Sequence, residues 1–110
     1  MTAVFQGGEV ALTGTTPVTA VAAPGASEQK QVLSLLAHNR DTTDRTITAK
    51  KLGGTVTVEI GKVVLASGGR GQLVQASVVL DGTGETITVE SDATAATTEP
   101  VIDVSVFKIP

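Results

Sequence analysis

No cysteine, tryptophan or tyrosine occurs in the 110 residues of this chain, and its only aromatic side chains are Phe5 and Phe107. The lack of cysteine excludes disulfide bonds and thiolate metal sites. The lack of tryptophan and tyrosine means that valine, isoleucine, leucine and alanine must fill the core. Such a core is thin for a domain of this size, so we expect the fold to gain stability from neighbouring molecules.

Charge is also sparse: the formal net charge is −3 at pH 7, and the basic residues are scattered singly apart from Lys50 and Lys51. Without a basic stripe or an aromatic platform, the chain is not expected to bind nucleic acid. No apolar run approaches the roughly 18 residues that a membrane-spanning helix needs. The first residues also lack the pattern of a signal peptide, so we expect none. The length is that of one domain.

The clearest pattern is the alternation in residues 55–60, which places Val56, Val58 and Ile60 on one face and polar residues on the other. Alternation with a period of two predicts a half-buried strand. Gly53 and Gly54 come just before it. This pair favours a tight turn between two antiparallel strands, because glycine tolerates a positive φ.

Residues 28–38 form a second strong run, in which both faces of an extended chain would be largely apolar. This pattern is typical of a central strand, although a helix capped by Ser27 is a competing interpretation. Within the predicted strand, Leu33, Leu35 and Ala37 would share one face.

Alternating aliphatic residues predict further strands over residues 45–51, 72–80, 85–90 and 101–109. Turn-forming residues separate the strands at 39–44, 67–71, 81–84 and 92–100. The sequence therefore predicts an all-β fold, namely an antiparallel two-sheet β-sandwich of Ig-like or jelly-roll type with about six to eight short strands.

The first 27 residues differ in composition, being rich in Gly, Ala, Thr and Pro with Glu9 as the single charged residue. Short strands at 9–13 and 18–22 would be interrupted by Gly14, Pro17 and Pro24. We therefore divide the chain into an N-terminal arm, residues 1–27, and a β-sandwich domain, residues 28–110. We expect the arm to lie on the fold or on a neighbouring molecule.

Candidate catalytic and metal-binding residues are few. His38 is the single histidine, and neither Ser34 nor Ser105 lies in a nucleophile motif, so catalysis is not expected. Asp41 and Asp44 could contribute to a calcium site, but the third acidic ligand and the glycine of a calcium loop are missing. Asx-turn hydrogen bonds are the better interpretation of these aspartates.

Two further patterns are incomplete as functional motifs. Asp81 and Glu85 could form the carboxylate pair of a glycosidase, but no suitable aromatic residue is present to stack a sugar. The glycine-rich segment 67–71 lacks the ending of a phosphate-binding loop, and its Arg70 is expected at an exposed tip, either solvated or paired with a carboxylate of a partner. We expect no enzyme activity, no cofactor and no bound metal.

The order of the elements resembles that of a known class of proteins. The run LLAHNRDTTDRTITAKK is followed by a glycine hairpin, then by VTVEIGKVVLASGG, VVLDGTGETITVESDA and a terminal VIDVSVFKI. Over residues 28–108 this succession of strands and turns resembles the small β-sandwich virion structural proteins of tailed bacteriophages, in particular head decoration (cement) proteins.

The resemblance implies a non-enzymatic capsid decoration protein, made in the host cytoplasm, that binds the outer head surface of the virion and stabilises it. The implied partner is the major capsid protein, and a homo-oligomer is expected, with a trimer favoured; no nucleic acid or membrane is expected as a partner. The alternatives are a neck or tail component, such as a head-closure or tail-terminator ring, and a receptor- or carbohydrate-binding β-sandwich module. The arm and the loops are the expected contact regions, with Arg40, Asp41, Asp44, Arg45 and Arg70 as contact candidates.

Overall fold

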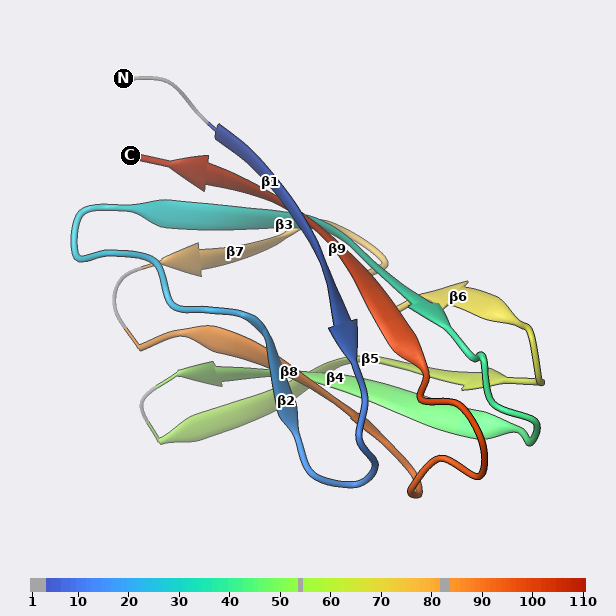
Figure 1. Ribbon diagram of the computed structural model, residues 1–110. Coiled ribbons are helices and arrows are strands. Elements are labelled where there is room, and N and C mark those ends of the chain that lie inside the picture. The colour runs from blue at the N-terminus through green and yellow to red at the C-terminus, as the bar shows by residue number, and fades with distance from the viewer. Residues whose placement is uncertain (1–3, 54, 82–83) are drawn as a thin grey trace.

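The computed structural model describes residues 4–53, 55–81 and 84–110. Over these residues the chain is all-β, with nine strands arranged in two antiparallel sheets that pack face to face (Figure 1). The predicted antiparallel β-sandwich is therefore confirmed, with one strand more than expected. In this described part of the chain, no helix is long and apolar enough to cross a membrane.

Each sheet has a simple strand order. One sheet runs β1 (Val4–Ala11), β9 (Val101–Ile109), β3 (Gln29–His38), with β6 (Arg70–Gln72) and β7 (Val78–Asp81) both paired to the far side of β3. The other runs β2 (Val18–Val21), β8 (Thr86–Ser91), β4 (Arg45–Gly53), β5 (Val56–Leu65). The start of β1 and the end of β9 lie side by side (Figure 1), because Val4 pairs with Lys108.

The core between the sheets is almost entirely aliphatic, as the composition requires. The alternating aliphatic residues of β4, β8 and β9 point inward as predicted: Ile47 and Ala49, Ile87 and Val89, and Ile102, Val104 and Val106 are buried. The fully or nearly fully buried apolar residues of the core include Leu12, Val32, Leu35, Ala37, Ile47, Ala49, Leu73, Leu80, Ile87, Val89, Ile102 and Val106. Burying each large aliphatic side chain contributes about 1.5–3 kcal/mol.

Residues 4–27 belong to the sandwich. β1 pairs with β9 along its whole length, and β2 pairs with β8 in the other sheet. Leu12, between these two strands, is fully buried and donates its backbone N–H to the carbonyl oxygen of Pro100. The change in composition at residue 27 is therefore not a boundary between structural units in the described chain; residues 1–3 of the predicted arm lie outside it.

The strand predicted over residues 28–38 is present as β3, so the helical alternative is wrong. Its predicted faces need a correction, because the register shifts between Val32 and Ser34. Such a bulge places one extra residue on the strand and changes the phase of the alternation. As a result Val32 and Leu35 are both buried, whereas Leu33 is 39% exposed.

β5 has the predicted phase and an unexpected exposure. Val58 lies opposite Lys51, which lies opposite the buried Ile87, so Val58 does point to the inner face of its sheet. It is nevertheless 51% exposed, and Val56 is 60% exposed. β5 is the edge strand of its sheet, and β6 of the opposite sheet approaches only its second half, near Val63. Alternation predicted the face correctly, but it carries no information on whether another sheet covers that face.

The strand predicted over residues 72–80 is divided into β6 and β7, and β6 begins inside the predicted loop 67–71. Leu73, between the two strands, is fully buried, and its backbone N–H donates to the carbonyl oxygen of Leu35. Its own carbonyl oxygen lies against Gly61 of β5, where a side chain would have no room. This close approach explains why a glycine interrupts β5.

Two predicted turns lie partly outside the described residues. Gly53 ends β4 opposite Val56, and Gly54, the second glycine of the predicted pair, is not described. Residues 82 and 83 of the predicted turn 81–84 are not described either, but Gly84 has a φ of 91°, which favours glycine at this position.

Replacing Gly61 by alanine should destabilise the fold, because the new Cβ would overlap the carbonyl oxygen of Leu73 and the backbone would have to move. We expect Gly61→Ala to lower the free energy of unfolding by about 2 kcal/mol or more, measured by urea titration. Gly8→Ala is the matched control, since no atom lies within 4 Å of the added Cβ there, and it should change stability by about 0.5 kcal/mol or less. Equal stability of the two variants would contradict the packing of Leu73 against β5.

Candidate functional site

Three loops meet at one end of the sandwich, and the buried side chain of Asn39 joins two of them. Its Nδ2 donates to the carbonyl oxygens of Thr43 and Leu65, and its Oδ1 accepts the backbone N–H of Asp41. The backbone of Asn39 also exchanges hydrogen bonds with Gly68 and Gly69. The loop after β3 is thereby fixed to the loop between β5 and β6.

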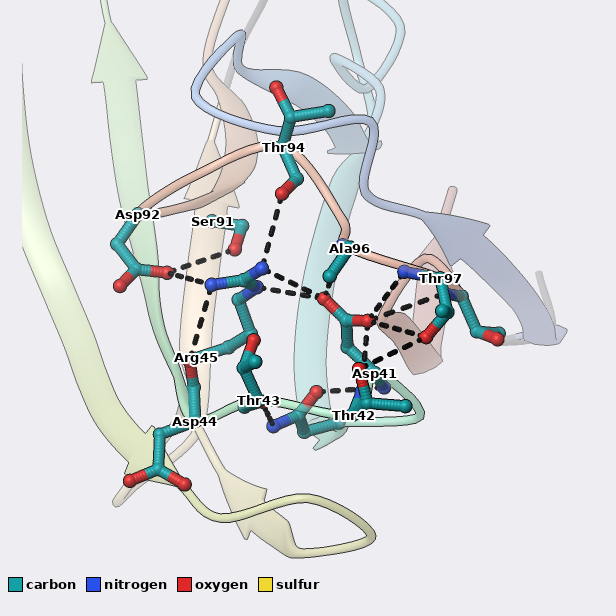
Figure 2. A network of polar contacts seen from close by, with 12 residues as sticks. Asp41, Thr42, Thr43, Asp44, Arg45, Ser91, Asp92, Thr94, Ala96 and Thr97 are labelled. Atoms are coloured by element: carbon teal, nitrogen blue, oxygen red, sulfur yellow. Dashed lines mark hydrogen bonds and ion pairs between the residues drawn. The ribbon is translucent and has the colours of Figure 1, made fainter.

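Asp41 connects the third loop, and its side chain is fully buried. Figure 2 shows its carboxylate surrounded by donors from residues 92–100. The backbone N–H of Ala96 donates to Oδ2 at 2.8 Å, and both the N–H and the hydroxyl of Thr97 donate to Oδ1. The N–H groups of Thr42 and Thr98 also donate to Oδ1. One carboxylate thus satisfies backbone donors of a loop more than fifty residues away.

Arg45 completes this loop junction. Its guanidinium makes an ion pair with Asp41 at 2.9 Å, and the side chain is only 11% exposed. It also donates to the carbonyl oxygens of Asp44 and Thr94 and lies 4.0 Å from the carboxylate of Asp92. Figure 2 shows the guanidinium between the two carboxylates. A buried carboxylate is stabilised when donors and a counter-charge surround it in this way.

These contacts also argue against a calcium site at Asp41. The hydrogen bond from the Ala96 backbone, together with those from Thr97 and Thr42, holds the pKa of the Asp41 carboxyl well below its usual range. Both carboxylate oxygens already accept hydrogen bonds from protein donors, which leaves little room for a cation. No group of metal-binding side chains occurs among the residues that the structure describes. The carboxylate of Asp41 therefore has a structural role, which is to hold the loops together.

The predicted contact candidates therefore fall into two groups. Asp41 is buried and the side chain of Arg45 is only 11% exposed, and both are engaged with each other in the loop junction. Arg40, Asp44 and Arg70 are exposed. Arg40 still donates from Nε to the carbonyl oxygen of Glu99, and Arg70 begins β6, where it lies opposite His38. Partner contact by these three residues stays a prediction.

The structure does not assemble a catalytic arrangement around the histidine in the described residues. His38 lies at the end of β3, opposite Val101, and no hydrogen bond joins it to a serine there. Ser34 instead accepts a hydrogen bond from the side chain of Gln72.

The Asp81 and Glu85 pair also has a structural use. Glu85 accepts a hydrogen bond from the backbone N–H of Asp81 and forms an ion pair with Lys51. The Asp81 hydrogen bond and then Lys51 lower the pKa of Glu85. A glycosidase acid needs a raised pKa, so this environment favours a structural role.

The two long edge strands are the other notable feature. β1 has eight residues, of which all but Val10 are exposed, and it carries one charge and no proline. β5 has ten residues and forms the edge of the other sheet; it carries Glu59 and Lys62 and has a bulge at Ile60, so it is less open than β1. Natural sheets usually protect such edges with short strands, proline or several charges, because an unpaired backbone edge can accept another strand. The other edges follow this rule, since β2, β6 and β7 have only four, three and four residues.

A cleft of about 210 Å³ lies beside the edge strand β1, between it and β2. Gly7, Gly8 and Glu9 line one side, and Ala20 and Ala22 of the β2 segment line the other. The residues around it are mainly small or apolar, and the open space at Gly8 is part of it. The sequence predicts the arm as a contact region but a strand only from Glu9 onward, because glycine has a low strand propensity.

No family model and no curated protein sequence matches this chain at a significant level. Among solved structures, the chain is similar to a protein of the Bacillus endospore appendages, described as a novel family of disulfide-linked pili. The TM-score is 0.57 at 19% sequence identity, and the match covers 98% of this chain and 88% of that one. At this identity the likeness concerns the fold.

This finding overturns the predicted function. The structural likeness leads to a bacterial endospore pilus and not to a phage capsid decoration protein, so that prediction is wrong. The resemblance to phage proteins rested on strand and turn order, which many β-sandwiches share. The capsid partner and the virion location remain untested, as does the expected homo-oligomer with its favoured trimer.

Removing the charge of Asp41 should loosen the loop junction, because the donors of residues 96–98 and Arg45 would lose a buried anionic acceptor. We expect Asp41→Asn to lower the melting temperature by about 10 °C or more. Asp44→Asn makes the same chemical change at an exposed neighbour and should shift it by only about 2 °C. Circular dichroism melting of both variants measures the difference, and similar shifts would contradict the role of Asp41.

The same carboxylate should make stability depend on pH in the acid range. Because its pKa is lower in the folded state than the ordinary value of 3.8, the unfolded chain binds the proton first as the pH falls. The stability contributed by Asp41 is therefore complete above about pH 5 and declines progressively below about pH 4. Urea midpoints measured between pH 6 and pH 2 should fall more steeply for the natural chain than for Asp41→Asn. Parallel profiles would contradict this assignment.

Proposed function

We propose that this chain is a non-enzymatic structural subunit that assembles with further copies of itself through non-covalent contacts at its sheet edges. The observation that carries the proposal is the unprotected edge of β1, a strand of eight residues that has one charge and no strand on its outer side among the described residues. Backbone groups on such an edge can extend the sheet into another molecule.

The fold adds a second line of support. A sandwich similar to this one occurs in a protein of disulfide-linked pili, so the architecture is compatible with repetitive assembly. The present chain contains no cysteine, which rules out disulfide linkage between its copies. Any assembly of this chain alone must therefore rely on backbone pairing, apolar contacts and charge.

Exposed apolar side chains also lie on the two long edge strands. Val4 and Phe5 on β1 are 51% and 58% exposed, and Val64 on β5 is 72% exposed. A thin aliphatic core also gives the single copy limited stability, which association would increase. The structural use of Asp41 and Glu85 supports a role without catalysis.

Self-association should be visible with the purified chain. We expect sedimentation velocity between about 1 and 500 μM to show species larger than the monomer that increase with concentration, because each edge is a weak site and mass action governs its occupancy. The distribution should not change with a thiol reductant, since no cysteine is present. Sedimentation as a monomer over the whole range would contradict the proposed function.

A further inference from the structure

The two long edge strands differ in charge in a way that indicates how copies would meet. In the pairing of β1 with β9, Glu9 lies opposite Asp103 on the outer face of the sheet. Like charges in directly opposite positions repel each other. No ion pair involves either residue in the described part of the chain, and both are exposed. The edge at β1 therefore carries two uncompensated carboxylates.

The edge at β5 carries two charged residues, Glu59, which lies opposite Lys50, and Lys62, whose charge matches the carboxylates of the β1 edge. Lys62 is exposed and lies opposite Thr48, on the face of β5 that points away from the core, and none of the ion pairs in the described residues includes it. The remaining lysines of this sheet, Lys50 and Lys51, are already paired with Glu90 and Glu85. Lys62 is thus an unsatisfied cation on one open edge, and Glu9 with Asp103 forms an unsatisfied anionic pair on the other.

We infer that β1 of one copy pairs in antiparallel fashion with β5 of a second copy, in the register that sets Glu9 opposite Lys62. This inference rests on the proposed self-assembly and names the partner of the same edge. Both residues project from the outer faces of their sheets, so the two outer faces become continuous across the junction. The ammonium group then lies next to Glu9, with Asp103 on the adjacent strand.

The sizes of the side chains agree with this register. In this register Gly7 of β1 lies opposite Val64 of β5, on the same outer face as Glu9 and Lys62. On the inner face, Gly8 lies opposite Val63. Gly8 has no atom within 4 Å of the position of a Cβ, and the ring of Phe5 lies beside the corresponding position of Gly7. The exposed side chain of Val64 can therefore pack over Gly7 and against Phe5.

The pairing joins two different edges, and this determines the form of the assembly. The copy that contributes β1 keeps its own β5 available, and the copy that contributes β5 keeps its own β1. A heterologous contact of this kind leads to an open filament unless its rotation closes a ring. No residue outside the chain is needed to extend it.

Charge reversal tests the inference with the intact chain in sedimentation velocity. Lys62→Glu should weaken association by about tenfold or more, because three carboxylates would then meet at the junction. Glu9→Lys should also weaken it, since two ammonium groups would then face each other across the junction. The double variant carrying both changes should recover most of the natural affinity, because the pair is restored with its charges exchanged. Asp81→Lys is the matched control: it makes the same charge change as Glu9→Lys at an exposed site on β7, an edge that the pairing does not use, and should leave association unchanged within about twofold.

The outcomes separate the two proposals. A natural chain that stays monomeric overturns the self-assembly function and the pairing together. A natural chain that associates, but whose Lys62→Glu and Glu9→Lys variants associate as tightly as Asp81→Lys, overturns the pairing while the assembly function stands. Failure of the double variant to recover affinity also overturns the pairing of Glu9 with Lys62. At a concentration where the chains are monomeric, all variants should still melt cooperatively, because the changed residues are exposed. Glu9→Lys should melt no lower than the natural chain, since it removes the repulsion from Asp103.

Discussion

The buried carboxylate of Asp41 is the interaction on which one whole end of the sandwich depends. A carboxylate without access to water must be surrounded by donors, and here these are the backbone N–H groups of residues 96–98 and the guanidinium of Arg45. Strands β3, β4, β8 and β9 all begin or end at the segments that supply these donors. One side chain therefore fixes how two sheets meet, in a chain that has no disulfide to do so.

Because the core is aliphatic, the hydrogen bonds of Asp41 are more important for the specificity of the fold. Neither phenylalanine lies in the core; Phe5 and Phe107 pack edge to face at 5.7 Å on the outer side of the first sheet. They stabilise β1 on β9, where Gly7 and Gly8 contribute no side-chain contacts. Among the described residues, the hydrophobic core between the sheets consists of small and branched aliphatic side chains, so specificity in packing the loops comes from hydrogen bonds such as those of the buried Asn39 and Asp41.

The strand alternation predicted the fold class and most inward positions, because the pleat dictates side-chain direction locally. It failed where distant parts of the chain decide the outcome. The exposure of Val58 depends on which strand lies opposite, and the loop junction depends on residues 92–100 approaching Asp41. The aspartate was recognised as a turn residue, but its burial could not be read from its neighbours. Gly7 and Gly8 obscured the start of β1 in the sequence, because glycine has a low strand propensity. The strand forms through its pairing with β9.

The contrast between the hydrogen-bonded loop end and the open sheet edges is the structural basis of the proposed assembly. Two of the contact candidates, Asp41 and Arg45, are paired with each other, and the junction that they form holds the relative position of the two sheets. Rigidity of the sandwich matters at the edges, because strand addition requires the neighbouring backbone to present its groups in a regular row. A chain that ordered its edges only on binding would lose affinity to the entropy of that ordering. The polar junction at one end thus holds the sheets in place while β1 offers its open edge for pairing.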